Sequence, residues 1–242
     1  MTQWTERGIL YVATGELYIE LAVRSAESVK KHCGDIRIHL FTDRDTAEFA
    51  VFDSTTIIQN PHRRSRLDCF SQTPFQRTLY LDAETCICTD IREIYDVLDR
   101  FDIAMAHAHL RNRKAMKEHW RIPIPDAFPQ FNSGVILYNK SAPVLDLLNK
   151  WKEAYFTAGF RKDQTTLREL LYLSNIRIAV LPPEYNIRFR KYLRVWNKYE
   201  AVPKVLHLEK YKYDVDRKIN RGLRHTIRRL RRRLVEFIKM FI

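Results

Sequence analysis

The stretch Arg77-Thr78-Leu79-Tyr80-Leu81-Asp82-Ala83-Glu84-Thr85 joins a short apolar run to a pair of acidic residues. Residues 78–81 have the composition of a buried strand, and Asp82 stands at its carboxyl end. Side chains at positions i and i+2 of an extended chain point the same way, so we expect Asp82 and Glu84 to face one point. Two carboxylates that close resist joint ionisation unless a cation lies between them. Oxygen ligands favour magnesium or manganese, so the pair is a candidate metal site.

The rest of the chain decides whether this pair is more than a solvated turn, which an isolated acidic pair after a strand also fits. Apolar runs predict further strands at residues 8–14, 36–41, 55–58, 101–106, 135–138, 176–181 and 204–208. Helical spacing of apolar residues predicts helices at residues 17–33, 91–98, 144–158 and 163–173. This alternation predicts a mixed α/β fold with a largely parallel sheet flanked by helices.

In such sheets, ligands bind beyond the carboxyl ends of the strands. Three predicted strands end in polar residues, namely Thr14-Gly15, Thr42-Asp43 and Asp82-Ala83-Glu84. We therefore expect these strand ends to converge on one edge of the sheet and to form a site there. Residues 109–129 are polar, basic and interrupted by proline, which predicts a long loop that is functional or mobile. We interpret His107 and His109 as loop residues rather than metal ligands.

Several common catalytic and nucleotide-binding patterns are missing from the 242 residues. There is no G-x-G-x-x-G, G-x-x-x-x-G-K-[ST], G-x-S-x-G or H-E-x-x-H motif, which argues against dinucleotide, P-loop, hydrolase and zinc-protease sites. The four cysteines form no C-x-x-C pair, so we expect reduced thiols. The first seven residues lack the apolar segment of a signal peptide, and no run of about 18 apolar residues occurs. We expect a cytoplasmic protein with possible peripheral contact to the inner membrane face.

The formal net charge of +13 is concentrated at the C-terminus, where residues 217–242 hold ten Lys or Arg and one acidic residue. Apolar residues recur there at helical spacing, at Leu223, Ile227, Leu230 and Leu234. We expect residues 1–213 to form the main domain and residues 214–242 to form a basic amphipathic helix on an anionic membrane surface. A helix packed on the body or on a partner fits the same charge. Binding of nucleic acid also fits it, and we rank that interpretation last.

Short motifs follow one another along residues 8–208. They are Tyr11-Val12-Ala13-Thr14-Gly15 with Tyr18, Arg66-Leu67, the stretch from Arg77 to Thr85, Phe131-Asn132-Ser133-Gly134, Asp163-Gln164, Pro182-Pro183-Glu184-Tyr185-Asn186, and His207. This order resembles glycosyltransferase family 8, a group of GT-A fold enzymes that contains glycogenin and bacterial lipopolysaccharide galactosyl- and glucosyltransferases.

The resemblance implies a GT-A, Rossmann-like fold and a retaining, metal-dependent hexosyltransferase. The implied donor is a nucleotide-diphosphate sugar, with UDP as the expected nucleotide. The implied acceptor is a saccharide, a lipid-linked saccharide or a protein. The implied cofactor is manganese or magnesium, held by Asp82, Glu84 and His207.

The resemblance also implies roles in donor binding. Nucleotide contacts fall to Thr14, Gly15, Tyr18, Arg66 and Ala83. The sugar pocket falls to Asn132, Ser133, Gly134, Asp163 and Gln164. Among these, the implied catalytic residues are Asn132, Asp163 and Gln164. The diphosphate contact falls to Lys210 or Lys212.

Two departures from the family pattern leave alternatives open. Glu84 replaces the usual second aspartate, and residues 208–213 lack the glycine and the Pro-Trp pair that follow the histidine in the family. An inactive relative that binds a nucleotide sugar or a membrane partner is therefore an alternative function. Asp163 also fits a helix N-cap, residues 132–134 fit a simple turn, and His207 fits an ordinary strand histidine. A nucleotidyltransferase is disfavoured because its Gly-rich N-terminal loop is absent.

Overall fold

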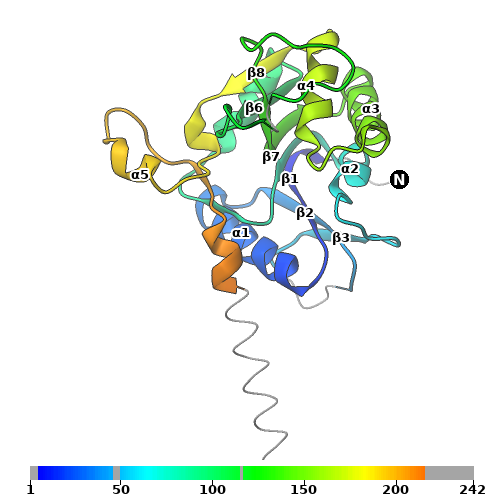
Figure 1. Ribbon diagram of the computed structural model, residues 1–242. Coiled ribbons are helices and arrows are strands. Elements are labelled where there is room, and N and C mark those ends of the chain that lie inside the picture. Colours follow the sequence, from blue (N-terminus) through cyan, green and yellow to red (C-terminus); the bar gives the residue numbers. More distant parts are fainter. Residues whose placement is uncertain (1–4, 46–49, 115–116, 216–242) are drawn as a thin grey trace, which may run out of the picture.

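The computed structural model describes residues 5–45, 50–114 and 117–215, and a seven-stranded sheet runs through its centre (Figure 1). From one edge to the other, the strands are β3 (Ser54–Ile57), β2 (Arg37–Thr42), β1 (Thr5–Ala13), β4 (Phe75–Leu81), β7 (Phe131–Asn139), β6 (Ile103–His107) and β8 (Ile178–Leu181). Neighbouring strands pair in parallel except at β7, which is antiparallel to both β4 and β6. The predicted α/β fold with a largely parallel sheet is therefore confirmed.

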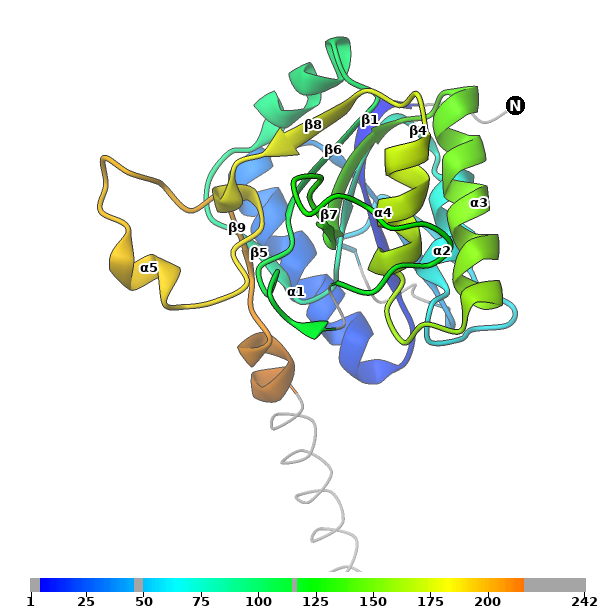
Figure 2. The ribbon, with the colours of Figure 1, turned by 45° about the horizontal axis from the view of Figure 1, so that its top comes forward.

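Helices cover both faces of this sheet. They are α1 (Glu16–Cys33), α2 (Arg66–Cys69), α3 (Ala142–Ala158), α4 (Gln164–Leu173) and a 3-10 helix at Arg92–Asp99. Successive strand residues point to opposite faces, so Ile9 and Tyr11 of β1 join the buried cluster under α1, whereas Leu10 joins the one under α3 and α4. Figures 1 and 2 show α1 on one side of the sheet and α3 with α4 on the other.

The reversal of β7 determines which residues meet at the edge where β1, β2 and β4 end. Leu81, the last residue of β4, pairs with Val135 of β7. The Asp82 amide donates a hydrogen bond to the Gly134 carbonyl at 2.8 Å. Because β7 runs opposite to β4, its first four residues lie beside the acidic pair. The alternative that residues 132–134 form a simple turn is wrong, because they belong to the strand.

A second, two-stranded sheet brings the C-terminal part of the chain to the same edge. It consists of β5 (Thr85–Ile87) and β9 (Val205–His207), and Thr85 pairs with His207. Since Thr85 directly follows Glu84, this pairing places His207 next to the acidic pair. The strand predicted at residues 204–208 is confirmed, whereas the three-residue β5 was not predicted.

The longer predicted helices and strands are confirmed with small shifts at their ends. Residues 91–98, predicted as an ordinary helix, form mainly a 3-10 helix. The short α2 and α5 (Tyr192–Val195) were not predicted. Residues 188–204 form an arm that carries α5 and projects from the body of the molecule (Figure 2).

A helix begins at residue 210 and continues to residue 215, the last one that the structure describes. The basic amphipathic helix was predicted for residues 214–242, of which all but residues 214 and 215 lie outside the described residues, as does its predicted contact with a membrane. Within the described part of the chain, no helix combines the length and the apolar character needed to cross a bilayer.

Candidate active site

Two adjoining clefts open at the edge where the polar strand ends meet. The larger has a volume of about 400 Å³, and its lining includes Asn132, Ser133, Gly134, Asp163, Gln164 and His207. The smaller has a volume of about 300 Å³, and its lining includes Thr14, Tyr18, Tyr80 and Ala83. Both clefts are lined by Arg64, Arg66, Asp82 and Glu84. The acidic pair therefore lies where the two clefts adjoin.

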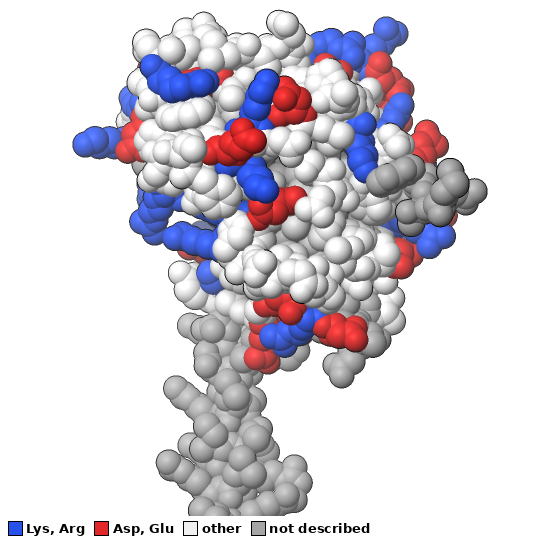
Figure 3. Space-filling view, turned by 90° about the vertical axis from the view of Figure 1, so that its right-hand side faces the viewer, with Lys and Arg blue, Asp and Glu red and all other residues white. Residues whose placement is uncertain are grey.

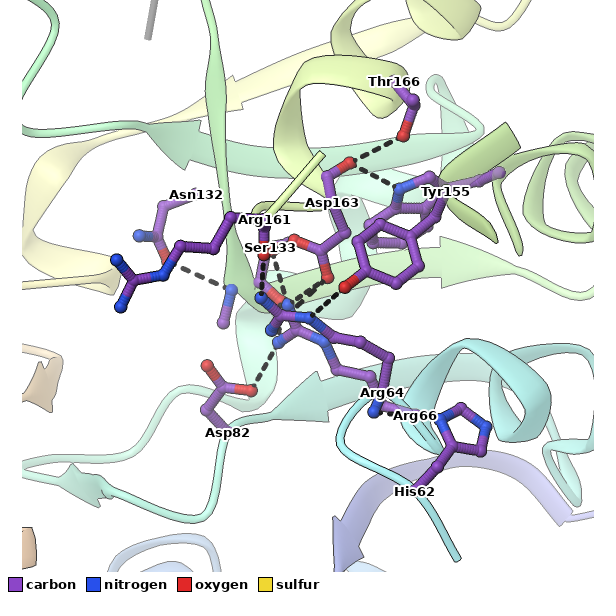
Figure 4. A network of polar contacts seen from close by, with 12 residues as sticks. His62, Arg64, Arg66, Asp82, Asn132, Ser133, Tyr155, Arg161, Asp163 and Thr166 are labelled. Carbon is purple, nitrogen blue, oxygen red and sulfur yellow. Dashed lines mark hydrogen bonds and ion pairs between the residues drawn. The ribbon is translucent and has the colours of Figure 1, made fainter. Parts of the chain in front are cut away.

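Arg66 connects the two halves of the site (Figure 4). One end of its guanidinium donates to Asp82 Oδ1 at 2.8 Å, and the other donates to Asp163 Oδ2 at 2.6 Å. The same group donates to the hydroxyl of Ser133 at 2.9 Å. Burial by itself lowers the pKa of Arg66, but the two carboxylates outweigh it and raise the pKa well above its usual value. Arg66 is thus a permanent cation that links β4 to the start of α4.

The two acidic side chains of the candidate metal site differ in their surroundings. Burial raises the pKa of Asp82, but Arg66 and the hydroxyl of Tyr80, which donates to Oδ1 at 2.6 Å, bring it below its usual value. Burial and the nearby charge of Asp82 raise the pKa of Glu84. Asp82 is therefore the firmer anion of the pair, and Glu84 gains most from a neighbouring cation.

The Nε2 atom of His207 faces both carboxylates, and its lone pair accepts no hydrogen bond from a described residue. Its Nδ1 lies 2.9 Å from Asn186 Oδ1, an acceptor, so the ring proton belongs on Nδ1. Its Nε2 is buried without a hydrogen-bond partner, 3.4 Å from Asp82 Oδ2 and 4.0 Å from Glu84 Oε1. Burial and the Arg188 cation lower the pKa of His207 to about 3, so the ring is neutral at pH 7. A neutral imidazole nitrogen aimed at two carboxylates has no proton to donate to them.

These three side chains fit a divalent cation in their chemistry. An imidazole lone pair and two carboxylates form a donor set that manganese accepts, and a cation would satisfy the orphaned Nε2. The space is kept open at Gly134, where an added Cβ would lie 2.5 Å from Asp82 Oδ2 and 2.1 Å from His207 Cε1. In the described part of the chain, however, no group of three or more His, Cys, Asp or Glu side chains is arranged so that it could hold a metal ion without moving.

The three residues predicted to act on the sugar all line the larger cleft. Asp163 precedes α4, but its side chain makes no helix-capping hydrogen bond, so the N-cap alternative is wrong for its carboxylate. Asp163 as a residue is only 2% exposed, and its carboxylate is bound by Arg66 instead. Asn132 Oδ1 accepts from the Gly134 amide and from Asn186 Nδ2, each at 3.0 Å. Gln164 opens α4 at the wall of the cleft.

Most but not all of the residues predicted to contact the nucleotide line the smaller cleft. Thr14 and Tyr18 line the smaller cleft. Gly15, at φ 75°, is the N-cap residue before α1, and its amide donates to Asp43 Oδ2 at 2.9 Å, so it shapes the loop without lining either cleft. Lys212 Nζ donates to the Tyr18 hydroxyl at 2.7 Å, at the rim of the smaller cleft. Lys210 lies 3.7 Å from Asp214 and lines neither cleft.

Several lining residues of the larger cleft were not predicted from the sequence. Among these are Arg64, His109, Arg113, Lys162, Arg188 and Glu209. They come from loops or element ends that carry no periodic pattern. Asn186, which orients His207, could have been found, because it ends the motif of residues 182–186.

The comparison with known families agrees with this fold and site. The sequence profile described as nucleotide-diphospho-sugar transferase matches residues 70–221, which is more than half of the chain. The chain is therefore a glycosyltransferase of the GT-A fold, similar to family 8. It belongs to the nucleotide-diphospho-sugar transferase family.

Solved structures show the same fold at low sequence identity. The galactosyltransferase LgtC, solved with donor and acceptor sugar analogues, is 17% identical, with a TM-score of 0.61 over 84% of this chain and 87% of that one. Mouse xyloside xylosyltransferase 1 is 15% identical, with a TM-score of 0.57 over 84% and 97%. The glycosyltransferase GlyE of Streptococcus pneumoniae is 15% identical, with a TM-score of 0.60 over 84% and 54%. No curated protein sequence matches the chain significantly.

Proposed function

We propose that this protein transfers a hexose from a UDP-sugar to a saccharide, lipid-linked saccharide or protein acceptor, with a divalent metal and with retention of configuration. The observation that carries this proposal is the unpartnered His207 Nε2, which faces Asp82 and Glu84 where the two clefts adjoin. A donor with a nucleoside in one cleft and a sugar in the other would cross that point with its diphosphate.

On this proposal, the smaller cleft holds the nucleoside. Tyr18 is 37% exposed, with Lys212 Nζ 4.9 Å from the centre of its ring, and it lines this cleft together with Thr14. Lys212 contacts the Tyr18 hydroxyl and lowers the pKa of Glu84 from nearby, so its charge reaches the expected diphosphate. We therefore favour Lys212 over Lys210 as the diphosphate contact.

Asp82, Glu84 and His207 would hold the metal, manganese or magnesium. Bound there, the ion would neutralise the diphosphate and stabilise charge on the leaving group. The chain's own part is to keep the site open at Gly134 and to fix the tautomer of His207 through Asn186. Arg66 holds Asp82 in place from the other side.

Transfer forms a bond between an acceptor hydroxyl oxygen and the anomeric carbon and breaks the bond to the diphosphate. Negative charge grows on the leaving phosphate, which can take up the proton that the acceptor hydroxyl loses. Arg188 supports this step on our proposal, because it lines the larger cleft and its charge acts on Asp82, Glu84 and His207. Asn132, Asp163 and Gln164 would orient the sugar from the walls of the same cleft.

The first test is manganese-dependent hydrolysis or transfer from a panel of UDP-hexoses, followed by Asp82→Asn. We expect activity that is lost on chelation and reduced at least about a hundredfold in the variant. The matched control is Asp90→Asn, because Asp90 is an exposed carboxylate bonded to Arg92 and away from both clefts. Full activity in Asp82→Asn would reject the metal site. Tight UDP binding without any turnover would favour the inactive, nucleotide-sugar-binding alternative.

Contact of residues 217–242 with an anionic membrane, and hence a peripheral location, stays a prediction on the sequence. It suits a lipid-linked acceptor because both would place the enzyme at a bilayer surface.

A further inference from the structure

The larger cleft contains basic side chains that the chain itself does not neutralise. Arg113, Lys162 and Arg188 line it, and none of them has an ion pair or a side-chain hydrogen bond among the described residues. Some surface cations, in contrast, are paired with acids, as in the pairs Lys150–Asp146 at 2.7 Å and Lys152–Asp68 at 2.8 Å. On the face shown in Figure 3, blue and red side chains are interspersed in this way. The three cations of the cleft are distinguished by lining one concave site together without such partners.

These cations are close enough to affect one another. Burial and the charges of Arg113, Arg161 and Arg188 lower the pKa of Lys162. The adjacent Asp163 acts in the opposite direction but does not offset them. Its carboxylate is already bound by Arg66 at 2.6 Å. This end of the cleft therefore has a positive potential that an incoming anion would relieve.

The loop that carries Arg113 is attached to α4, the same helix that begins beside Lys162. Arg168 of α4 donates to the backbone carbonyls of Pro125 and Phe128 at 2.8 and 2.7 Å. The buried carboxylate of Glu169 accepts from the Arg121 amide at 2.8 Å. These contacts hold residues 121–128 against α4, and the Arg113 amide donates to the Leu110 carbonyl at 3.0 Å within the loop.

The donor accounts for one of the three cations but not for all. In the proposed function, on which this inference rests, the diphosphate meets the metal, and Arg188 acts beside it. Arg113 and Lys162 then remain for whatever fills the rest of the larger cleft. The hydroxyl groups of a neutral acceptor could accept hydrogen bonds from these two side chains, but they would leave the positive charge uncompensated, whereas an anionic group would form the stronger, charge-assisted hydrogen bonds.

We propose that Arg113 and Lys162 bind an anionic group, a phosphate or a carboxylate, on the acceptor saccharide. Charge-assisted hydrogen bonds from a guanidinium and an ammonium group suit such a group and would orient the acceptor toward the donor sugar. The acceptor class that follows is a phosphorylated sugar or a uronic acid rather than a neutral glycan.

The test measures acceptor binding to the protein saturated with UDP and manganese, so that sugar phosphates cannot occupy the donor site. Calorimetry at low ionic strength compares hexose phosphates and hexuronates with neutral methyl hexosides and with inorganic phosphate. We expect at least one anionic sugar to bind about tenfold or more tightly than its neutral counterpart. Hexose phosphates and hexuronates form separate arms, which distinguishes the two sources of charge.

Substitutions test whether Arg113 and Lys162 cause the tighter binding of anionic sugars. Arg113→Ala/Lys162→Ala should abolish it, whereas the charge-conserving Arg113→Lys/Lys162→Arg should keep most of it. The matched control Arg24→Ala/Lys31→Ala removes the same charge from the exposed surface of α1 and should keep the preference in full. Thermal unfolding shows whether each variant is folded.

Equal binding of anionic and neutral sugars to the unmodified protein would overturn the inference, as would a preference that survives Arg113→Ala/Lys162→Ala. Inorganic phosphate that binds as tightly as the sugar phosphates would also overturn it, because the site would then recognise an ion and not an acceptor. A failure of UDP and manganese to bind the unmodified protein would instead reject the proposed function.

Discussion

A single substitution at Gly134 tests the metal-site hypothesis most directly. In Gly134→Ala, the new Cβ would meet Asp82 Oδ2 at 2.5 Å and His207 Cε1 at 2.1 Å, so one or both side chains must move. We expect manganese-dependent UDP binding to weaken at least about tenfold, and overpacking to cost about 1–3 kcal/mol of folding stability. Calorimetry and urea unfolding measure the two effects.

Gly159→Ala separates crowding of the site from a general loss of stability. Gly159 ends α3 at φ 68°, and a Cβ there would meet nothing within 4 Å. The strained backbone should cost about 1 kcal/mol, while UDP binding should stay at the level of the unmodified protein. If both variants lose UDP binding in proportion to their stability, Gly134 has no special role at the metal site.

Individual site residues were predictable where a neighbouring pattern marks them. Asp82 and Glu84 follow an apolar strand, and their convergence with His207 is found in the structure. Asp163 was ambiguous, because a residue before a helix fits both a cap and a pocket. Arg66, 97 positions away in the chain, binds its carboxylate, which excludes the cap, while the contact with the sugar stays a prediction.

At the scale of elements, Trp151 of α3 fixes the position at which α4 begins. Its ring is fully buried and stacks on Phe70 at 5.5 Å, and its Nε1 donates to the Asp163 carbonyl at 2.8 Å. Trp151→Phe should lose this hydrogen bond and leave a cavity, at a cost of about 2–4 kcal/mol in urea unfolding. We also expect slower turnover of the donor, because Asp163 and Gln164 follow the movement of the helix end.

A second core variant distinguishes positioning from simple destabilisation. Phe70→Leu opens a cavity beside the same indole but leaves the bond to Asp163 in place. Donor hydrolysis measured well below both unfolding temperatures should fall more in Trp151→Phe than in Phe70→Leu. Equal losses would mean that α3 supports the site only through general stability.

Elements were predictable in proportion to their length. The 18-residue α1 has enough turns for its apolar spacing to be recognised, whereas α2 and β5, of four and three residues, are too short for a helical or strand period to repeat. The direction of β7 has no signature in the sequence, although it decides that residues 131–134 meet Asp82. The pairing of β5 with β9 joins segments more than a hundred residues apart, and no local sequence pattern indicates which distant segments pair, so it could not be predicted.

At the scale of the whole molecule, buried neutral histidine makes folding sensitive to acid. His39 of β2 is 5% exposed, its Nδ1 lies 2.7 Å from Ser54 Oγ, and its Nε2 has no partner among the described residues. Burial lowers the pKa of His39 to about 4. Burial, with nearby cations, likewise lowers the pKa of His109 to about 4.

The sign of the effect follows from where the proton binds. An unfolded histidine has a pKa near about 6.5, so between that value and about 4 the unfolded chain takes up a proton that folded His39 refuses. Stability is therefore complete above about pH 6.5 and falls as the pH drops toward 4. His39 alone should account for a loss of about 2 kcal/mol between about pH 7.5 and pH 5. His39→Gln, which cannot titrate, should remove that part of the loss. Urea unfolding at the two pH values, in chelator to exclude metal, measures it, and an unchanged loss in the variant would mean that His39 is solvated or paired when folded.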